Sequence, residues 1–235
     1  MKQMKIWIVA LTFIMGLSFT SCVNSDNDTW NVSAYVTTNS MYPYDATLLG
    51  DDGVNYIPTN PSALRWDNSD EYAKRALVYM KYVEGEDGAP NKASYSVEIV
   101  GASGITVKSL NQLPDTLENS YPVNDFGIWA INGYITVASA LYITSNSIDL
   151  ELFLDYETIE EEGVKDNIVP MKYQFTQGGT EYGGTSNATP VVSWTVPSAD
   201  KLYEYGVNMS DSVVFKISAK NSSSSELTRT YKYKY

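Results

Sequence analysis

Hydrophobic and polar residues alternate with a period of two through most of the chain after residue 30. In the segment 31–37, Val32, Ala34 and Val36 face one way and the intervening side chains face the other. This alternation is typical of a strand with one buried face, because successive side chains of a strand point to opposite sides of the sheet. Similar short segments follow to the end of the chain, and before residue 110 only one helical turn, at 69–72, is expected. The pattern predicts an all-β fold.

The strands expected in the first half are short and closely spaced. They cover residues 32–37, 47–49, 54–57, 76–83, 94–100 and 105–107. The second and third are joined by Gly50-Asp51-Asp52-Gly53, a tight turn in which glycine accepts positive φ at little cost. Five or so strands of this length suit a small barrel, and we assign residues 31–110 to a β-barrel domain.

A polar segment with a proline at 111–115 marks the expected domain boundary. The strands expected after it cover residues 127–131, 134–142, 149–156, 173–175, 191–196, 211–219 and 229–235. Strands at this spacing, separated by Gly, Asn and Pro, favour two packed sheets. We therefore assign residues 115–235 to a β-sandwich domain.

The first 21 residues have the order of a secretory signal peptide. Lys2 and Lys5 precede an apolar run at 6–17, and small polar residues lead to Cys22, the only cysteine. The run is too short for a comfortable membrane span. An ordinary cleaved signal would leave Cys22 as a free thiol in an exported protein, which is a liability. The cysteine count therefore points to a modified Cys22.

The segment Phe19-Thr20-Ser21-Cys22 resembles a bacterial lipobox, with Phe19 in place of the usual aliphatic residue. The resemblance implies cleavage before Cys22 and acylation of this residue, so that membrane lipid is a partner. Residues 22–30 are polar and are expected to form the lipidated tether. The acidic Asp26 and Asp28 partly resemble the signal that sends lipoproteins of Bacteroidetes to the outer membrane. We expect the protein to be anchored there, on its periplasmic or its exterior face.

Charge and composition exclude several classes of function. Lys and Arg number 16 against 28 Asp and Glu, for a net charge of −12, which disfavours nucleic acid as a partner. The chain has no histidine, so it offers no Ser-His or Cys-His nucleophile pair and no imidazole ligand for zinc. We predict a protein that is not an enzyme, with no catalytic residues, no metal and no cofactor.

A carboxylate-only hydrolase is the remaining catalytic alternative. Asp149, Glu151, Asp155 and Glu157 share a period of two, and a glycosidase needs two carboxyl groups about 5 to 10 Å apart across a cleft. Leucines at 150, 152 and 154 explain the same alternation if they face the core. We favour a solvated sheet face.

Acidic turns raise the question of calcium. The candidates are the turns at 50–53, 84–88 and 160–163, whose oxygens calcium could use. None has the EF-hand spacing, and acidic turns are common on protein surfaces. We expect no calcium site.

Aromatic residues make up 13% of the chain, with 19 tyrosines. Tyr42, Tyr44, Tyr56 and Trp66 fall in or beside loops of the expected barrel, where oligosaccharide-binding barrels hold their ligands. These four residues are the candidate ligand-facing aromatics. The alternative is that tyrosine covers half-exposed strand surface, where it is a preferred residue.

Several segments together resemble the NigD-like lipoproteins of Bacteroidetes. They are the end of the lipobox, the strand at 35–37, the hairpin at 48–53, the strand at 76–80 and the pair Ile128-Trp129 with residues 133–135. The resemblance implies an OB-like barrel followed by an immunoglobulin-like β-sandwich. The family is named after a gene in a bacteriocin cluster, which implies an immunity role, and it offers no catalytic residues to carry over.

The sequence thus predicts a non-catalytic, lipid-anchored envelope protein that acts as a binding module. Its expected partner is another envelope protein or a bacteriocin, in an immunity-like role. The alternative is a cell-surface glycan-binding lipoprotein that works beside an outer-membrane importer.

Overall fold

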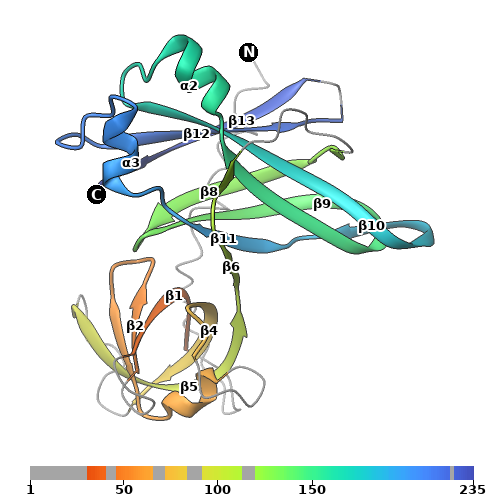
Figure 1. Ribbon diagram of the computed structural model, residues 1–235. Helices are drawn as coiled ribbons and strands as arrows, with labels where there is room; N and C mark the ends of the chain where they lie inside the picture. The colour runs from red at the N-terminus through yellow and green to blue at the C-terminus, as the bar shows by residue number, and fades with distance from the viewer. Residues whose placement is uncertain (1–30, 41–45, 66–71, 84–91, 113–119, 223–224) are drawn as a thin grey trace, which may run out of the picture. The chain divides into compact units, whose positions relative to one another are not determined.

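The computed structural model describes residues 31–40, 46–65, 72–83, 92–112, 120–222 and 225–235. Between Ile105 and Thr106 the chain divides into two compact units. Both are built almost entirely from strands (Figure 1). None of the helices in the described ranges is long and apolar enough to cross a membrane.

The first unit is a closed five-stranded barrel. Its strands are β1 (Val32–Ser40), β2 (Ala46–Gly50), β3 (Asn55–Pro58), β4 (Arg75–Tyr82) and β5 (Ser94–Gly104). They are hydrogen-bonded in the order β1-β2-β3-β5-β4, and β4 pairs with β1 to close the barrel. Only β3 and β5 run parallel, and a short 3-10 helix, η1 (Pro61–Leu64), lies between β3 and β4 in the chain. Closure of the sheet removes its unpaired edges.

Alternate residues of these strands fill the barrel. Val36, Leu48, Val78, Met80 and Val97 are each 0% exposed. The β2–β3 turn is the hairpin that the sequence predicts, with Gly53 at φ +81°. Burial on one face of every strand explains why the period of two was visible in the sequence.

The second unit is an eight-stranded sheet that curls over its own core. Its strands are β6 (Thr106–Lys108), β7 (Asn111–Gln112), β8 (Asp125–Ile131), β9 (Tyr134–Leu154), β10 (Ile168–Ala188), β11 (Val191–Thr195), β12 (Val213–Lys220) and β13 (Glu226–Tyr233). The main order is β13-β12-β10-β9-β11-β6, and β7 and β8 also pair with β9. β9 belongs to both layers, because its first third pairs with β8 and β11 and the remainder pairs with β10.

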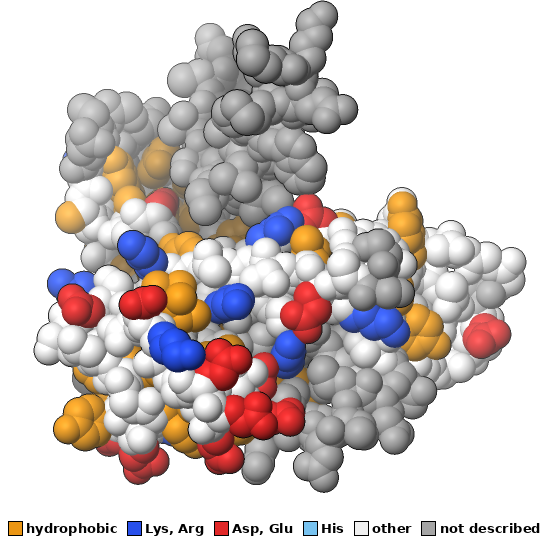
Figure 2. All heavy atoms as spheres, turned by 90° about the horizontal axis from the view of Figure 1, so that it is seen from above, with side chains coloured by type: hydrophobic (Ala, Val, Ile, Leu, Met, Phe, Trp, Pro, Cys, Tyr) orange, Lys and Arg blue, Asp and Glu red, His pale blue; other side chains and the backbone are white. Residues whose placement is uncertain are grey.

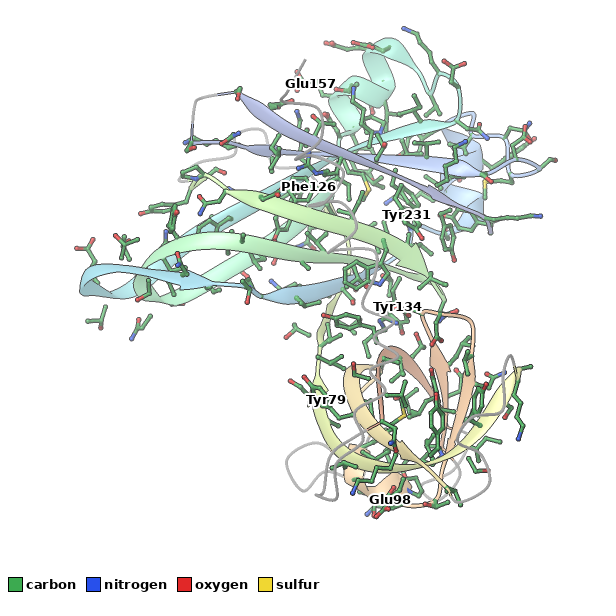
Figure 3. The ribbon with its side chains drawn as sticks, turned by 180° about the vertical axis from the view of Figure 1, so that it is seen from behind. Tyr79, Glu98, Phe126, Tyr134, Glu157 and Tyr231 are labelled. Atoms are coloured by element: carbon green, nitrogen blue, oxygen red, sulfur yellow. The ribbon has the colours of Figure 1, made fainter. Side chains whose placement is uncertain are left out.

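Large side chains from both layers meet in the core of this unit. Trp194, Phe126, Phe175 and Phe215 are at most 1% exposed. Tyr231 of β13 packs against the same cluster (Figure 3). Across the seam where β13 approaches β8, Arg229 binds Asp125 at 2.7 Å and lies 5.9 Å from the ring centre of Phe126. The ion pair joins two strands that do not pair through their backbones.

Two short helices follow strands of this unit. α2 (Tyr156–Glu162) comes directly after β9, and α3 (Ala199–Glu204) follows β11. Each begins with a side-chain cap: Asp155 accepts from the backbone N–H of Thr158 at 3.2 Å, and Ser198 accepts from that of Lys201 at 3.3 Å. Such caps satisfy amide donors that the first helical turn leaves without a partner.

The predicted fold class is confirmed: the chain is nearly all-β, with a closed five-stranded barrel followed by a curled multi-stranded sheet. The bounds of several strands differ from the sequence prediction, and β10, expected at 173–175, covers Ile168–Ala188. The strand expected at 149–156 stops at Leu154, since Asp155 caps α2 instead of continuing the sheet. The expected strands at 134–142 and 149–156 are parts of the single strand β9, whose polar middle is held by pairing with β10.

Candidate functional site

The most exposed large side chain among the described hydrophobic residues is Tyr203, at 73%. It lies on α3, beside Leu202, which is fully buried. The Ser198 cap fixes the start of this helix, and burial of Leu202 fixes its rotation. The local sequence therefore turns Tyr203 outward, although an exposed ring of this size gains nothing from the core.

Two further tyrosines stand close to α3. The rings of Tyr156, at the start of α2, and Tyr205, just after α3, have centres 5.5 Å apart and meet at 59°. The ammonium of Lys201 lies 5.2 Å from the ring centre of Tyr156. Aromatic pairs and cation–π contacts at such distances are attractive. We call Tyr156, Tyr203 and Tyr205, with Lys201, Glu160 and Glu204, the tyrosine surface.

Two glutamates lie near the hydroxyl of Tyr205. The pKa of the Tyr205 hydroxyl is raised by desolvation, by the neighbouring Tyr156 and by the charges of Glu204 and Glu160. Both glutamates are exposed, and within the described ranges neither forms an ion pair. Glu157 and Glu161 extend the acidic region along α2. Figure 2 looks down on α2 and shows acidic side chains gathered toward the lower edge of that face, with hydrophobic side chains beside them.

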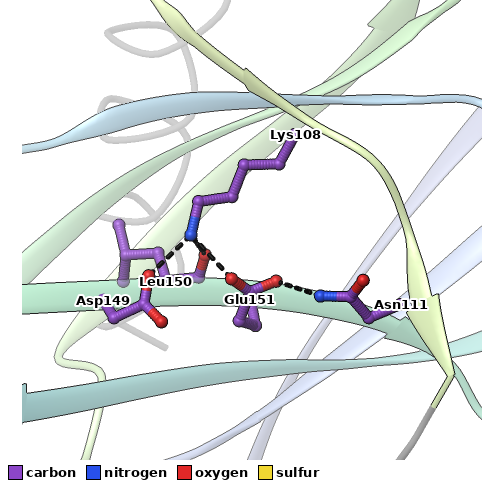
Figure 4. A network of polar contacts seen from close by, with 5 residues as sticks. All are labelled: Lys108, Asn111, Asp149, Leu150 and Glu151. Carbon is purple, nitrogen blue, oxygen red and sulfur yellow. Dashed lines mark hydrogen bonds and ion pairs between the residues drawn. The ribbon is translucent and has the colours of Figure 1, made fainter.

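A second polar cluster ties β6 and β7 to β9 (Figure 4). The ammonium of Lys108 donates to Asp149 Oδ1 at 2.6 Å, to Glu151 Oε1 at 2.7 Å and to the carbonyl of Leu150 at 2.9 Å. Asn111 donates to the other oxygen of Glu151 at 2.9 Å. Burial lowers the pKa of Lys108, but the hydrogen bonds to the two carboxylates outweigh it and the net shift is upward. All three ammonium protons have acceptors, so the cluster is a structural clamp.

The four carboxylates with a period of two are not gathered in one place. Asp149 and Glu151 share Lys108, Asp155 is a helix cap only 5% exposed, and Glu157 lies on α2 (Figure 3). The leucines between them face the core, with Leu152 fully buried, as the sheet-face interpretation predicts. A glycosidase needs two carboxyl groups that face each other across a cleft, whereas Asp149 and Glu151 are both bound to Lys108.

The predicted ligand-facing aromatics are mostly outside the described residues. Tyr42, Tyr44 and Trp66 lie there, as does Cys22, the predicted lipidation site. Tyr56 is described, and its side chain is 2% exposed in the barrel core, with its hydroxyl donating to Asp52 at 2.7 Å. The ring of Tyr56 therefore belongs to the core and not to a ligand-facing surface.

The acidic turns that were considered for calcium do not form a shared site among the described residues. Arg75, fully buried, binds both oxygens of Asp51 at 2.6 and 2.7 Å, and Asp52 accepts from Tyr56. The turn at 84–88 is outside the described residues, and Glu160–162 are exposed on α2. Among the residues that the structure describes, no group of three or more acidic or cysteine side chains is placed to hold a metal ion.

The sequence prediction missed the tyrosine surface because it missed both helices that form it. Signals for them exist: Asp155 and Ser198 are good cap residues, Glu157 and Asp200 follow in the first turns, and Gly163 and Gly206 end the helices with positive φ. The alternation of polar and apolar residues up to Tyr156 predicted a strand there, so the start of α2 was not recognised. The second is short enough to resemble a loop.

No protein-family model matches the chain, and no curated protein matches its sequence. Solved structures do share the fold. A candidate lipoprotein from Bacteroides fragilis is 14% identical, with a TM-score of 0.60 over 86% of this chain and 97% of that chain. A candidate toxin-related protein from Parabacteroides distasonis is 13% identical, with a TM-score of 0.61 over 86% and 92%.

A NigD-like immunity protein from Bacteroides caccae is also similar, at 13% identity and a TM-score of 0.55 over 88% of this chain and 94% of that chain. These identities are low, so the likeness concerns the fold. At that level the resemblance to NigD-like lipoproteins, expected from the sequence, is confirmed: the structural neighbours of this chain include candidate lipoproteins and a NigD-like immunity protein.

Proposed function

We propose that this protein is a lipid-anchored envelope protein that acts by binding another protein, in an immunity-like role toward an incoming toxin. The observation that carries the binding role is the tyrosine surface, where Tyr203 is 73% exposed and the half-buried rings of Tyr156 and Tyr205 pack against each other. Tyrosine is enriched at protein interfaces because it buries a large area with few rotatable bonds and keeps a polar tip.

The anchor is supported by the sequence at Cys22. A signal-like segment precedes this single cysteine, and two or three acyl chains on it would hold the protein stably at a bilayer. The similar fold of a candidate lipoprotein agrees with this assignment. We place the protein at the outer membrane, on the strength of the acidic tether that follows Cys22.

A binding role fits the polar clusters better than a catalytic one. Asp149 and Glu151 are held by Lys108, and Asp51 is held by Arg75. Groups engaged in this way stabilise the fold and are not poised to move protons. The chain also has no histidine to serve as a base near neutral pH.

The glycan-binding alternative has less support from the described residues. A sugar platform stacks pyranose rings on aromatic faces, whereas Tyr156 and Tyr205 meet at 59° and the face of Tyr156 is taken by Lys201. The barrel aromatics proposed for this role are buried, as Tyr56 is, or lie outside the described residues. We therefore favour a protein partner.

The proposed immunity role is tested by comparing a deletion strain with its parent in sensitivity to bacteriocins from neighbouring strains. The proposal expects the deletion strain to be more sensitive to at least one bacteriocin and expression of the intact chain to restore the parental response. Equal sensitivity across a broad panel would contradict the immunity role. A deletion strain that instead loses growth on particular glycans would favour the alternative.

A further inference from the structure

We propose that the partner docks on the tyrosine surface through a cationic segment, one that presents arginine or lysine side chains. This inference rests on the proposed function, since it names the chemistry of the partner that a binding module would take. It follows from three properties of the surface: ring exposure, an internal cation and unpaired acidic charge.

Tyr203 is exposed, whereas the rings of Tyr156 and Tyr205 are half-buried and hold each other in place. Tyr156 and Tyr205 pack against each other with centres 5.5 Å apart, and Tyr203 projects from a helix whose next-door Leu202 is buried in the core. The packed pair of Tyr156 and Tyr205 loses little conformational entropy when a partner covers it, and the helix fixes the backbone from which Tyr203 projects. The surface is therefore preorganised for binding, in contrast to long flexible side chains.

One cation already occupies part of this surface. Lys201 places its ammonium 5.2 Å from the ring centre of Tyr156, the geometry that a cation–π contact requires. The contact shows that an ammonium fits against the ring of Tyr156. Among the described residues no cation lies over the ring of Tyr203, which is 73% exposed and offers its face to an equivalent group on another molecule.

The charge around the rings is acidic and is not neutralised. Glu160 and Glu204 lie near enough to Tyr205 to raise its pKa, and with Glu157 and Glu161 they outnumber Lys201 and Lys165. Among the glutamates of α2, only Glu162 forms an ion pair within the described part of the chain, with Lys165 at 3.9 Å. Clustered like charges repel, and a cationic partner removes that repulsion.

The same charges argue against other occupants. An anionic lipid surface or a nucleic acid would meet repulsion from the carboxylates. A neutral glycan would leave their charge uncompensated. A protein segment rich in arginine or lysine can form cation–π contacts with the rings and ion pairs with the carboxylates. Arginine in particular stacks on aromatic faces.

The test uses the full chain in non-ionic detergent and a short fluorescent peptide of alternating arginine and glycine, with binding followed by fluorescence polarisation at physiological salt. We expect this peptide to bind at least tenfold tighter than one with glutamine in place of arginine. Replacing both rings, Tyr203→Ala with Tyr205→Ala, should weaken binding about tenfold, which corresponds to about 1.4 kcal/mol. Tyr203→Ala alone, at an exposed site that folding does not need, should weaken it about threefold.

Matched controls come from the same unit. Tyr142, 58% exposed on β9, and the exposed Glu181 on β10 lie on other elements. Tyr142→Ala and Glu181→Gln should each change the dissociation constant less than twofold, whereas Glu160→Gln with Glu204→Gln should weaken binding and flatten its salt dependence. Equal effects at Tyr142 and Tyr203, or equal binding of the two peptides, would overturn the proposal.

The result of the peptide-binding test can be distinguished from the result of the bacteriocin test of the proposed function. If the deletion strain and its parent are equally sensitive to bacteriocins, the immunity role is contradicted, but the peptide-binding result still stands. If the deletion strain is more sensitive to a bacteriocin but the protein does not bind the arginine peptide, the immunity role stands and the proposal of a cationic partner is refuted.

Discussion

Burial divides the tyrosines of this chain into two groups with different roles. Tyr56 and Tyr173 are 2% exposed and fill the cores of the two units, whereas Tyr203 is 73% exposed. Sequence position alone does not separate them, because tyrosine suits a buried strand position and a surface one equally well. The strand period placed Tyr56 next to loops, but it is the inward direction of its side chain on β3 that decides its role.

Alkaline pH should destabilise the protein through its buried tyrosines. Desolvation raises the pKa of Tyr173 although its hydrogen bond with Ser139 lowers it, so the folded state disfavours the ionised ring. The stabilising contribution is complete below the unfolded-state pKa of about 10 and is lost as pH rises above it, by up to about 1.4 kcal/mol per pH unit for one group. Urea unfolding at several pH values measures this loss. Tyr173→Phe should reduce the slope above pH 10, and an unchanged slope would contradict the assignment.

The buried guanidinium of Arg75 should be the most sensitive polar position of the barrel. It is fully buried and binds both oxygens of Asp51 at 2.6 and 2.7 Å. Asp51→Ala removes the countercharge, and removal of one partner of a buried pair costs about 3 kcal/mol. Thermal or urea unfolding measures the change. Asp200→Ala, at an exposed site on α3, is the control and should cost less than about 0.5 kcal/mol. Similar costs at both positions would show that the pair is unimportant.

The strands were predicted best where burial is strictly one-sided. β4 and the β2–β3 hairpin lie within one residue of their expected bounds, and β1 begins at the expected residue but ends three residues later, because the barrel core imposes the alternation directly. β9 and β10 are longer than expected. The polar stretch at 143–148 resembles a loop in isolation, and only its pairing with β10 holds it extended. Long-range pairing of this kind leaves no local mark in the sequence.

The clamp at Lys108 should contribute to the stability of the second unit. Its ammonium joins β6 to Asp149 and Glu151 on β9. Lys108→Ala leaves two neighbouring carboxylates without their shared cation and should cost about 1 to 2 kcal/mol, less at high salt. Lys165→Ala is the matched control, since that side chain is 73% exposed and 3.9 Å from Glu162. A cost below about 0.5 kcal/mol for Lys108→Ala, measured by urea unfolding, would contradict the clamp.

The order of barrel and sandwich could be expected from the full length of the sequence, whereas the binding surface could not. Strand spacing and the resemblance to NigD-like lipoproteins predicted both units, and the similar solved structures agree with them. The tyrosine surface is formed by α2 and α3, which are separated by more than thirty residues in the chain. Their proximity depends on the path of β10 and β11, which no local pattern records.

The lipid anchor is tested by replacing Cys22 with serine. Without the thiol no acyl chain can be attached, so the variant should move from the membrane fraction to the soluble fraction, as immunoblotting of the two fractions would record. Ser21→Ala, which keeps the thiol, should leave the protein at the membrane. Retention of the Cys22→Ser variant in the membrane fraction would refute the lipoprotein assignment.

The most direct measurement places a photo-crosslinking phenylalanine analogue at position 203 or at position 142 in living cells. Both positions are exposed, at 73% and 58%, and they lie on different elements of one unit. If the protein acts by binding through the tyrosine surface, position 203 should give a discrete crosslinked partner, identified by mass spectrometry, whose linked segment is rich in arginine or lysine. Position 142 should give none. The same products from both positions, or none from position 203, would contradict the account.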